Sequence, residues 1–204
     1  MAFRLTLTGV GAMNSPRFKP AGLLVDYDGR KVMLDGGSSS PVPGGLAAWL
    51  VTDERAELIR EVKDRAAEAG LEAAMGSFTS GGLSVEARPV VHTTRPTVAY
   101  RIEAEGCRIV WAPEFYEFPE WIEDEDLLFA DAAGWDRPIH FTGKIGGHAP
   151  ALAVAREART RGVKRLILAH IGRPTIRAMD RGERPPFGQF GRDGMVFEPR
   201  RWRT

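Results

Sequence analysis

The sequence predicts an α/β fold in which two β-sheets pack face to face and helices cover their outer faces, an αββα sandwich. Strand-like segments, either alternating or wholly apolar, recur along the chain, and one helical segment interrupts them in each half. Hydrophobic residues make up 43% and charged residues 27% of the 204 residues, a composition that can bury a substantial core. We expect residues 1–204 to form a single domain.

The first half of the chain predicts short strands followed by one helix. The strands are expected over residues 3–7, 22–27, 30–35 and 46–51. Asp28-Gly29 separates the second and third of these strands and is typical of a two-residue hairpin turn. After Thr52 the apolar spacing becomes helical, and Gly70 is a typical stop signal for that helix.

The second half predicts a hairpin and two buried strands with a helix between them. Strands are expected over residues 83–91, 98–103, 108–112, 126–131, 163–170 and 194–199. Glu105-Gly106 marks the hairpin turn between the second and third of these strands. Pro150 and Gly162 bracket the helix, which is expected over residues 149–161. The last strand would form an edge of the sandwich.

Charge and cysteine content narrow the function classes. Lys and Arg number 28 and Asp and Glu number 27, so the net charge is +1 and gives no electrostatic argument for nucleic-acid binding. A single cysteine, Cys107, excludes a disulfide framework and a cysteine-based zinc site. We find neither a signal-peptide pattern nor an apolar run long enough to span a membrane, and therefore expect a cytoplasmic protein.

Acidic residues and histidines recur where the predicted elements end, which is where functional sites are commonly built. They are Asp35, Asp53, Glu57, His92, Glu114, Asp131, His148 and His170. Each histidine taken alone is better explained as an ordinary loop residue or a helix cap. Thr52 or Asp53 would likewise serve as the N-cap of the following helix, whose dipole acidic residues in the first turn complement.

Four stretches along the chain occur in a distinctive order. They are Leu5-Thr-Leu-Thr-Gly with Val32-Met-Leu-Asp-Gly-Gly, then His92-Thr-Thr-Arg-Pro, then Asp126-Leu-Leu-Phe-Ala-Asp131 with Gly147-His148-Ala-Pro, and finally Leu166-Ile-Leu-Ala-His170. In this order they resemble the metallo-β-lactamase superfamily and, within it, the ribonuclease Z-like branch. The resemblance covers nearly the whole chain and implies the αββα sandwich of that family.

The chain departs from this family at the metal-binding signature, His-x-His-x-Asp-His. Asp53 and Arg55 stand where the first two histidines should be, Glu57 stands for the acid, and Leu58 replaces the last histidine. The resemblance also places Glu114 at the position of the bridging aspartate. The side chains that can still ligate a metal are therefore Asp53, Glu57, His92, Glu114 and His170.

These substitutions argue against the full di-zinc centre of the family, because each zinc ion takes about four ligands and Leu58 offers none. Arg55 also brings a fixed positive charge to the place of an ion. We expect one divalent ion in an oxygen-rich shell, which favours Mn²⁺, Fe²⁺ or Mg²⁺, with Zn²⁺ also a candidate. The alternative is that Arg55 replaces the metal, paired with Glu57 or Glu114 in a dry pocket or bound to an anionic ligand.

The resemblance further implies a catalytic pair, in which Asp131 orients His148 to protonate the leaving oxygen. The alternative is that His148 only precedes and caps the next helix. Two functions are consistent with these residues. One is a single-metal hydrolase of an ester or phosphoester bond, and the other is a non-catalytic relative that binds a small anionic ligand or a protein partner in the former active-site pocket. A small-molecule substrate and a homodimer are the expected partners.

Overall fold

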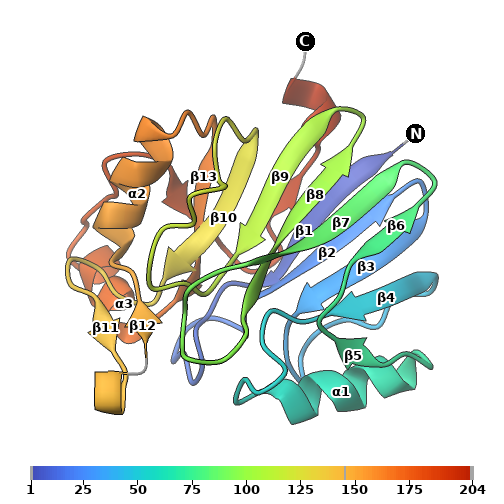
Figure 1. Cartoon of the computed structure of the whole chain (residues 1–204), viewed down its shortest axis with the longest axis horizontal. Coiled ribbons are helices and arrows are strands. Elements are labelled where there is room, and N and C mark those ends of the chain that lie inside the picture. Colours follow the sequence, from blue (N-terminus) through green and yellow to red (C-terminus); the bar gives the residue numbers. More distant parts are fainter. Residues whose placement is uncertain (1, 145, 203–204) are drawn as a thin grey trace.

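Two β-sheets face each other in the computed structural model, which describes residues 2–144 and 146–202 (Figure 1). A single hydrophobic cluster contains inward-facing side chains of both sheets, among them Leu5 and Val25 of one sheet and Ile102 and Phe129 of the other. Helices lie on the two outer faces. The predicted αββα sandwich is therefore confirmed.

The first sheet consists mainly of the amino-terminal strands. Its order is β15-β1-β2-β3-β4-β5. The strands are β1 (Phe3–Gly9), β2 (Gly22–Tyr27), β3 (Arg30–Asp35), β4 (Leu46–Leu50), β5 (Ala73–Ala74) and β15 (Val196–Phe197). The strand β15 pairs with β1 at the edge, as the sequence predicted for the carboxyl-terminal segment. The Asp28-Gly29 turn takes positive φ angles of 52° and 81°, as a tight hairpin between β2 and β3 requires.

The second sheet has the order β14-β13-β10-β9-β8-β7-β6. The strands are β6 (Phe78–Ser80), β7 (Leu83–Pro89), β8 (Val98–Ala104), β9 (Cys107–Ala112), β10 (Leu127–Ala132), β13 (Leu166–Ile171) and β14 (Gln189–Phe190). The strands β9, β10 and β13 run parallel to one another. Every residue of β10 and β13 is buried, which is typical of parallel strands covered on both faces. A separate two-stranded ribbon joins β11 (Ile139–His140) to β12 (Gly147–His148).

The helices cover the outer faces through small apolar residues. Helix α1 (Ile59–Glu68) buries Val62 and Ala66 in a cluster with Trp49 and Met33 of the first sheet. Helix α2 (Ala151–Thr160) buries an alanine-rich face and lies beside β10 and β13 (Figure 1). None of the helices in the described part of the chain has both the length and the apolar character needed to cross a membrane.

The start of one helix and several short elements, among them β5, β6, β11, β12 and β14, differ from the sequence-based expectation. Helix α1 begins at Ile59, so neither Thr52 nor Asp53 is its N-cap. The intervening residues instead form turns, in which the Asp53 carboxylate accepts a hydrogen bond from the Arg55 backbone N–H at 2.7 Å. A short helix, α3 (Arg173–Asp180), was not predicted and follows directly after β13.

Candidate active site

Three of the predicted site residues lie at one edge of the second sheet because their strands are parallel. Asp131 is near the carboxyl end of β10, His170 is near the carboxyl end of β13, and Glu114 follows the end of β9. Parallel neighbouring strands bring their carboxyl ends to the same edge, where ligand sites of such sheets are usually built. The topology therefore assembles residues that are 56 positions apart in sequence, from Glu114 to His170.

His170 is held in a conformation that its own strand does not favour. The register between β10 and β13 shifts after Asp131, since Asp131 pairs with Ala169 and Ala132 pairs with Ile171. His170 is the extra residue of this bulge and has a φ of 52°, in the left-handed region. Such a conformation costs a non-glycine residue roughly 1–3 kcal/mol and is found most often at functional sites. The bulge directs the imidazole to the edge where Glu114 lies.

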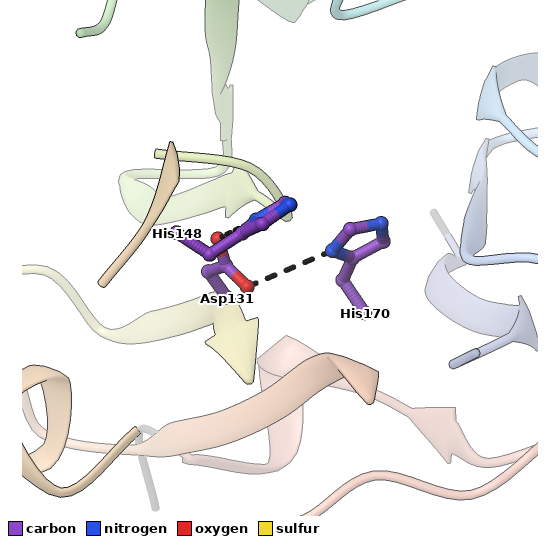
Figure 2. A group of neighbouring side chains, drawn as sticks. All are labelled: Asp131, His148 and His170. Carbon is purple, nitrogen blue, oxygen red and sulfur yellow. Dashed lines mark hydrogen bonds and ion pairs between the residues drawn. The ribbon is translucent and has the colours of Figure 1, made fainter. Parts of the chain in front are cut away.

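Asp131 anchors two imidazole rings at this edge, as Figure 2 shows. The Asp131 side chain is fully buried, and its carboxylate lies 2.7 Å from Nδ1 of His148 and 3.6 Å from Nδ1 of His170. It also accepts hydrogen bonds from the backbone N–H groups of Ala133 and Phe115. Burial raises the pKa of this carboxyl, but the His148 imidazole and the hydrogen bonds outweigh burial and hold the pKa well below its usual range.

His92 is positioned by the glycines that precede His148. Its Nδ1 lies 2.8 Å from the Gly147 carbonyl oxygen, and the Gly147 N–H donates to the His92 carbonyl oxygen at 2.9 Å. A Cβ atom on Gly146 would lie 1.8 Å from that His92 oxygen, and Gly146 has a φ of 132°. Only glycine permits this approach. The Gly-Gly-His segment therefore sets the places of both His92 and His148.

The carboxylate of Glu114 lies between two imidazoles. Its Oε2 is 3.3 Å from Nε2 of His92, and its Oε1 is 3.2 Å from Nε2 of His170. Burial raises the pKa of Glu114, but the charges and hydrogen bonds of these histidines outweigh burial and lower it to about 2. Burial alone would lower the pKa of His170, but the negative charges and hydrogen bonds of Glu114 and Asp131 outweigh burial and raise the pKa of His170 to about 10.

Asp131, His148 and His170 offer ligand atoms that all lie within 4.8 Å of one another, a grouping that could hold a metal ion. The Nδ1 atoms of both histidines face Asp131, however, and this carboxylate is already occupied by backbone donors. Asp131 is therefore better placed to orient the two rings than to ligate. The free Nε2 face of His170 points instead to Glu114.

The residues that the resemblance places at the signature lie around this centre. Asp53 is buried and Glu57 is exposed, and both line the space next to Glu114 and His170. Arg55 is exposed, and within the described residues it forms no ion pair with Glu57 or Glu114. The expectation that Arg55 pairs with an acid in a dry pocket is therefore wrong. The turns before α1 carry its side chain outward, to the mouth of the site.

Two cavities adjoin the centre. A cleft of about 470 Å³ opens above His92, His148 and His170, and we call it the arginine cleft because Arg55, Arg95 and Arg173 line it. A smaller cavity of about 60 Å³ is also lined by Glu114 and His170, and we call it the apolar pocket. Leu58 lines the apolar pocket.

Arg95 and Arg173 also belong to the site, although they were not predicted from the sequence. Both are exposed arginines close to motif histidines, and neither was singled out because arginine is a common surface residue. Their place follows from the loop after His92 and from α3, which begins directly after β13. Phe141 was also missed, and its ring packs edge-on against those of His92 and His148 at centroid distances of 5.4 and 5.3 Å. The remaining histidine, His140, does not line the cleft.

No protein-family profile matches the sequence, and no curated protein matches it. Solved structures do match the fold. The metallo-β-lactamase fold protein YhfI from Bacillus subtilis has a TM-score of 0.74 at 18% identity, over 97% of this chain and 100% of that chain. A diphosphatase from the PhnP family has a TM-score of 0.73 at 17% identity, over 96% and 97% of the two chains. The short form of human tRNase Z has a TM-score of 0.70 at 15% identity, over 96% and 98%.

This chain therefore has the metallo-β-lactamase fold, and the resemblance seen in its motifs is confirmed at the level of the fold. The matches span almost the full length of both chains in each comparison. At identities of 15–18% the likeness concerns the fold alone, so what the chain does has to be argued from its own site.

Proposed function

We propose that this protein is a single-metal hydrolase of an ester or phosphoester bond, with His92, His170 and Glu114 holding the ion. The observation that carries the proposal is the orientation of the two imidazoles. Nδ1 of His92 lies 2.8 Å from the Gly147 carbonyl oxygen, Nδ1 of His170 faces the Asp131 carboxylate at 3.6 Å without a hydrogen bond, and both rings turn Nε2 towards Glu114. An acceptor behind the ring is the usual companion of a metal-ligating histidine.

Each imidazole also lies at ligand spacing from Glu114, from a different oxygen of its carboxylate. Nitrogen-to-oxygen separations of 3.2 and 3.3 Å are close to those between neighbouring ligands of one ion, roughly 3–3.5 Å when its bonds are about 2.1 Å long. Asp53 and Glu57 line the same space and can complete an oxygen-rich shell. Two imidazoles with carboxylates suit Mn²⁺, Fe²⁺ or Zn²⁺. A full di-zinc centre is not proposed, because Leu58 offers no ligand atom.

When bound, such an ion supplies Lewis-acid activation of water and of the substrate oxygen. The chain itself supplies the proton for the leaving group. Asp131 fixes the Nδ1–H tautomer of His148 through the 2.7 Å contact, which leaves Nε2 of this ring to hold and donate a proton in the arginine cleft. Phe141 packs against the His148 ring and limits its rotation. The role of the pair follows that of other carboxylate–imidazole pairs.

Hydrolysis of model esters tests the proposal. Bis(p-nitrophenyl) phosphate and p-nitrophenyl acetate are incubated with protein loaded with Mn²⁺, Fe²⁺ or Zn²⁺. We expect turnover of at least one substrate, and loss of metal and turnover together in His170→Ala. The matched control is His140→Ala, since His140 is exposed and lies outside the cleft. Turnover that persists undiminished in His170→Ala contradicts the proposal.

A second function, from a different class, is favoured by the altered signature. Arg55 and Leu58 replace two ligand histidines of the family, and the chain still keeps a cleft lined by arginines. A non-catalytic protein that binds a small anionic ligand would need these arginines and no ion. Tight binding of an anion by protein that takes up no metal would favour this second function.

A further inference from the structure

The arginine cleft and the apolar pocket meet at the proposed reaction centre. Glu114 and His170 line both cavities, as do Asp53, Ala56 and Glu57. A ligand at this centre can therefore extend in two directions. One cavity is lined by arginines and the other mainly by apolar side chains, and this difference restricts the chemistry of the ligand.

The apolar pocket occupies the side of the centre where the signature is altered. Its wall includes Val51, Ala56, Leu58, Ile59, Val62 and Pro113. Asp35 also lines it, but one Asp35 oxygen accepts from the Thr52 N–H and the other from Trp111 Nε1, so this carboxylate is already satisfied. A space of about 60 Å³ holds a group of about four to six water-sized atoms at roughly 10–15 Å³ each. The pocket fits a short aliphatic group.

The arginine cleft presents positive charge on three separate elements. Arg55 precedes α1, Arg95 follows His92, and Arg173 opens α3. All three side chains are exposed, and none forms an ion pair with another residue of the described ranges. Thr93 and Thr94 add hydroxyl groups to the same wall. Unpaired guanidinium groups around one cleft suit a phosphate or carboxylate, which they bind with charge-assisted hydrogen bonds.

We propose that the ligand of this site is a small two-ended molecule, with an anionic group in the arginine cleft and a short aliphatic group of about four carbons in the apolar pocket. Leu58, in the place of a ligand histidine, makes the pocket apolar, and Arg55, in the place of another, adds charge to the cleft. This inference rests on the proposed function in taking Glu114 and His170 as the reaction centre. The binding it describes needs no hydrolysis, so the two can be tested separately.

Alkylphosphonates test the inference, because they carry an anion and a tail and contain no ester bond to cleave. Methyl-, n-butyl- and n-octylphosphonate are titrated into the protein by calorimetry, with and without Mn²⁺. Burial of one methylene is worth about 0.8 kcal/mol, or about 4-fold in affinity, so the three extra methylenes of the butyl compound should tighten binding about 60-fold. The octyl compound should gain nothing further, since its tail exceeds the pocket.

Variants separate the two ends. Leu58→Gln should remove the preference for the butyl tail, and Leu58→Ala should shift the preference to the longer tail. Leu152→Gln is the matched control, since Leu152 is half-buried on α2 and lines neither cavity. Arg95→Gln should weaken all three phosphonates about 10-fold, the loss of one hydrogen bond to a charged group. Arg177→Gln, an exposed arginine of α3 outside the cleft, should change nothing.

Equal affinity for the methyl and butyl compounds overturns the inference, as does a tail preference that survives in Leu58→Gln. An Arg95→Gln protein that binds as tightly as the parent overturns its anionic half. Tail-dependent binding by a protein that takes up no metal and cleaves no ester would refute the proposed function and leave this inference standing. Ester hydrolysis without any tail preference would support the proposed function and overturn this inference.

Discussion

Removal of the Asp131 carboxylate is the perturbation whose effect the structure specifies most closely. The side chain is fully buried and accepts from His148 Nδ1 at 2.7 Å, from the Ala133 N–H at 2.8 Å and from the Phe115 N–H at 3.2 Å. In Asp131→Ala, two buried backbone N–H groups and one imidazole lose their acceptor at once. In Asp131→Asn, the shape and one oxygen remain, but the charge is lost.

The size of the effect follows from these contacts. Removing one partner of a buried ion pair costs about 3–5 kcal/mol. Each buried N–H left without an acceptor costs about 1–3 kcal/mol, but part of this is regained as the loop after β10 relaxes or admits water. We therefore expect Asp131→Ala to lower the free energy of unfolding by about 4–5 kcal/mol, and Asp131→Asn by about 2 kcal/mol. The pKa of Asp131 is depressed, so this stabilisation is present at neutral pH and is lost as the pH falls below about 4.

Urea unfolding at pH 7.5 in the presence of a chelator measures both variants without a contribution from bound metal. Asp136→Asn is the control, because Asp136 is exposed and lies five residues further along the same segment; it should shift the unfolding free energy by less than about 0.5 kcal/mol. A loss below about 1 kcal/mol in Asp131→Ala would refute the view that this carboxylate holds the two rings in place.

Three further outcomes are expected. Burial raises the pKa of Asp35 to about 6, so ionisation of this carboxyl opposes folding. The free energy of unfolding should therefore decline by at most about 3 kcal/mol between pH 4 and pH 6, and Asp35→Asn should remove this decline. Urea unfolding at several pH values across that range measures both proteins. Gly146→Ala should lower stability by more than about 3 kcal/mol and displace His92, because its Cβ would lie 1.8 Å from the His92 carbonyl oxygen; thermal unfolding measures the loss. His148→Gln should lower turnover of a model ester by about 100-fold or more while metal content stays unchanged, measured by steady-state kinetics and elemental analysis.

The first two of these outcomes have a control in the same chain. Asp28→Asn, at an exposed hairpin turn, should leave the pH dependence of stability unaltered. Gly44→Ala should be nearly neutral, because a Cβ at Gly44 meets no atom within 4 Å. A His148→Gln protein that loses its metal would show that this ring ligates the ion, which contradicts its assignment as proton donor.

The fold was predictable because most of its strands carry a local signal. The segment from β2 to β3 shows alternation on both sides of an Asp-Gly turn, and the structure has the same hairpin. The start of α1 was misplaced by six residues, from Asp53 to Ile59, because the acidic side chain that could cap a helix instead caps a turn. Helix α3 was missed because it is only eight residues long and its start is set by the end of β13.

The site was less predictable, because its geometry depends on contacts between distant segments. The family resemblance predicted Glu114 and His170 as site residues. The bulge that turns His170 towards Glu114 was not predictable, because it depends on the pairing between β10 and β13. Arg55 was considered as a substitute for the metal, whereas its side chain is exposed at the cleft. Charged residues on loops gain a function only through the positions of those loops, and no local pattern records that.

Metal content tests the central claim most directly. The protein is purified after growth with added Mn, Fe and Zn, dialysed, and measured by elemental analysis beside His170→Ala and the control His140→Ala. We predict about one ion per chain in the parent and in the control, and almost none in His170→Ala. A parent protein without a stoichiometric ion under all three supplements, or a His170→Ala protein with an undiminished ion, would contradict a single-metal centre at His92, Glu114 and His170.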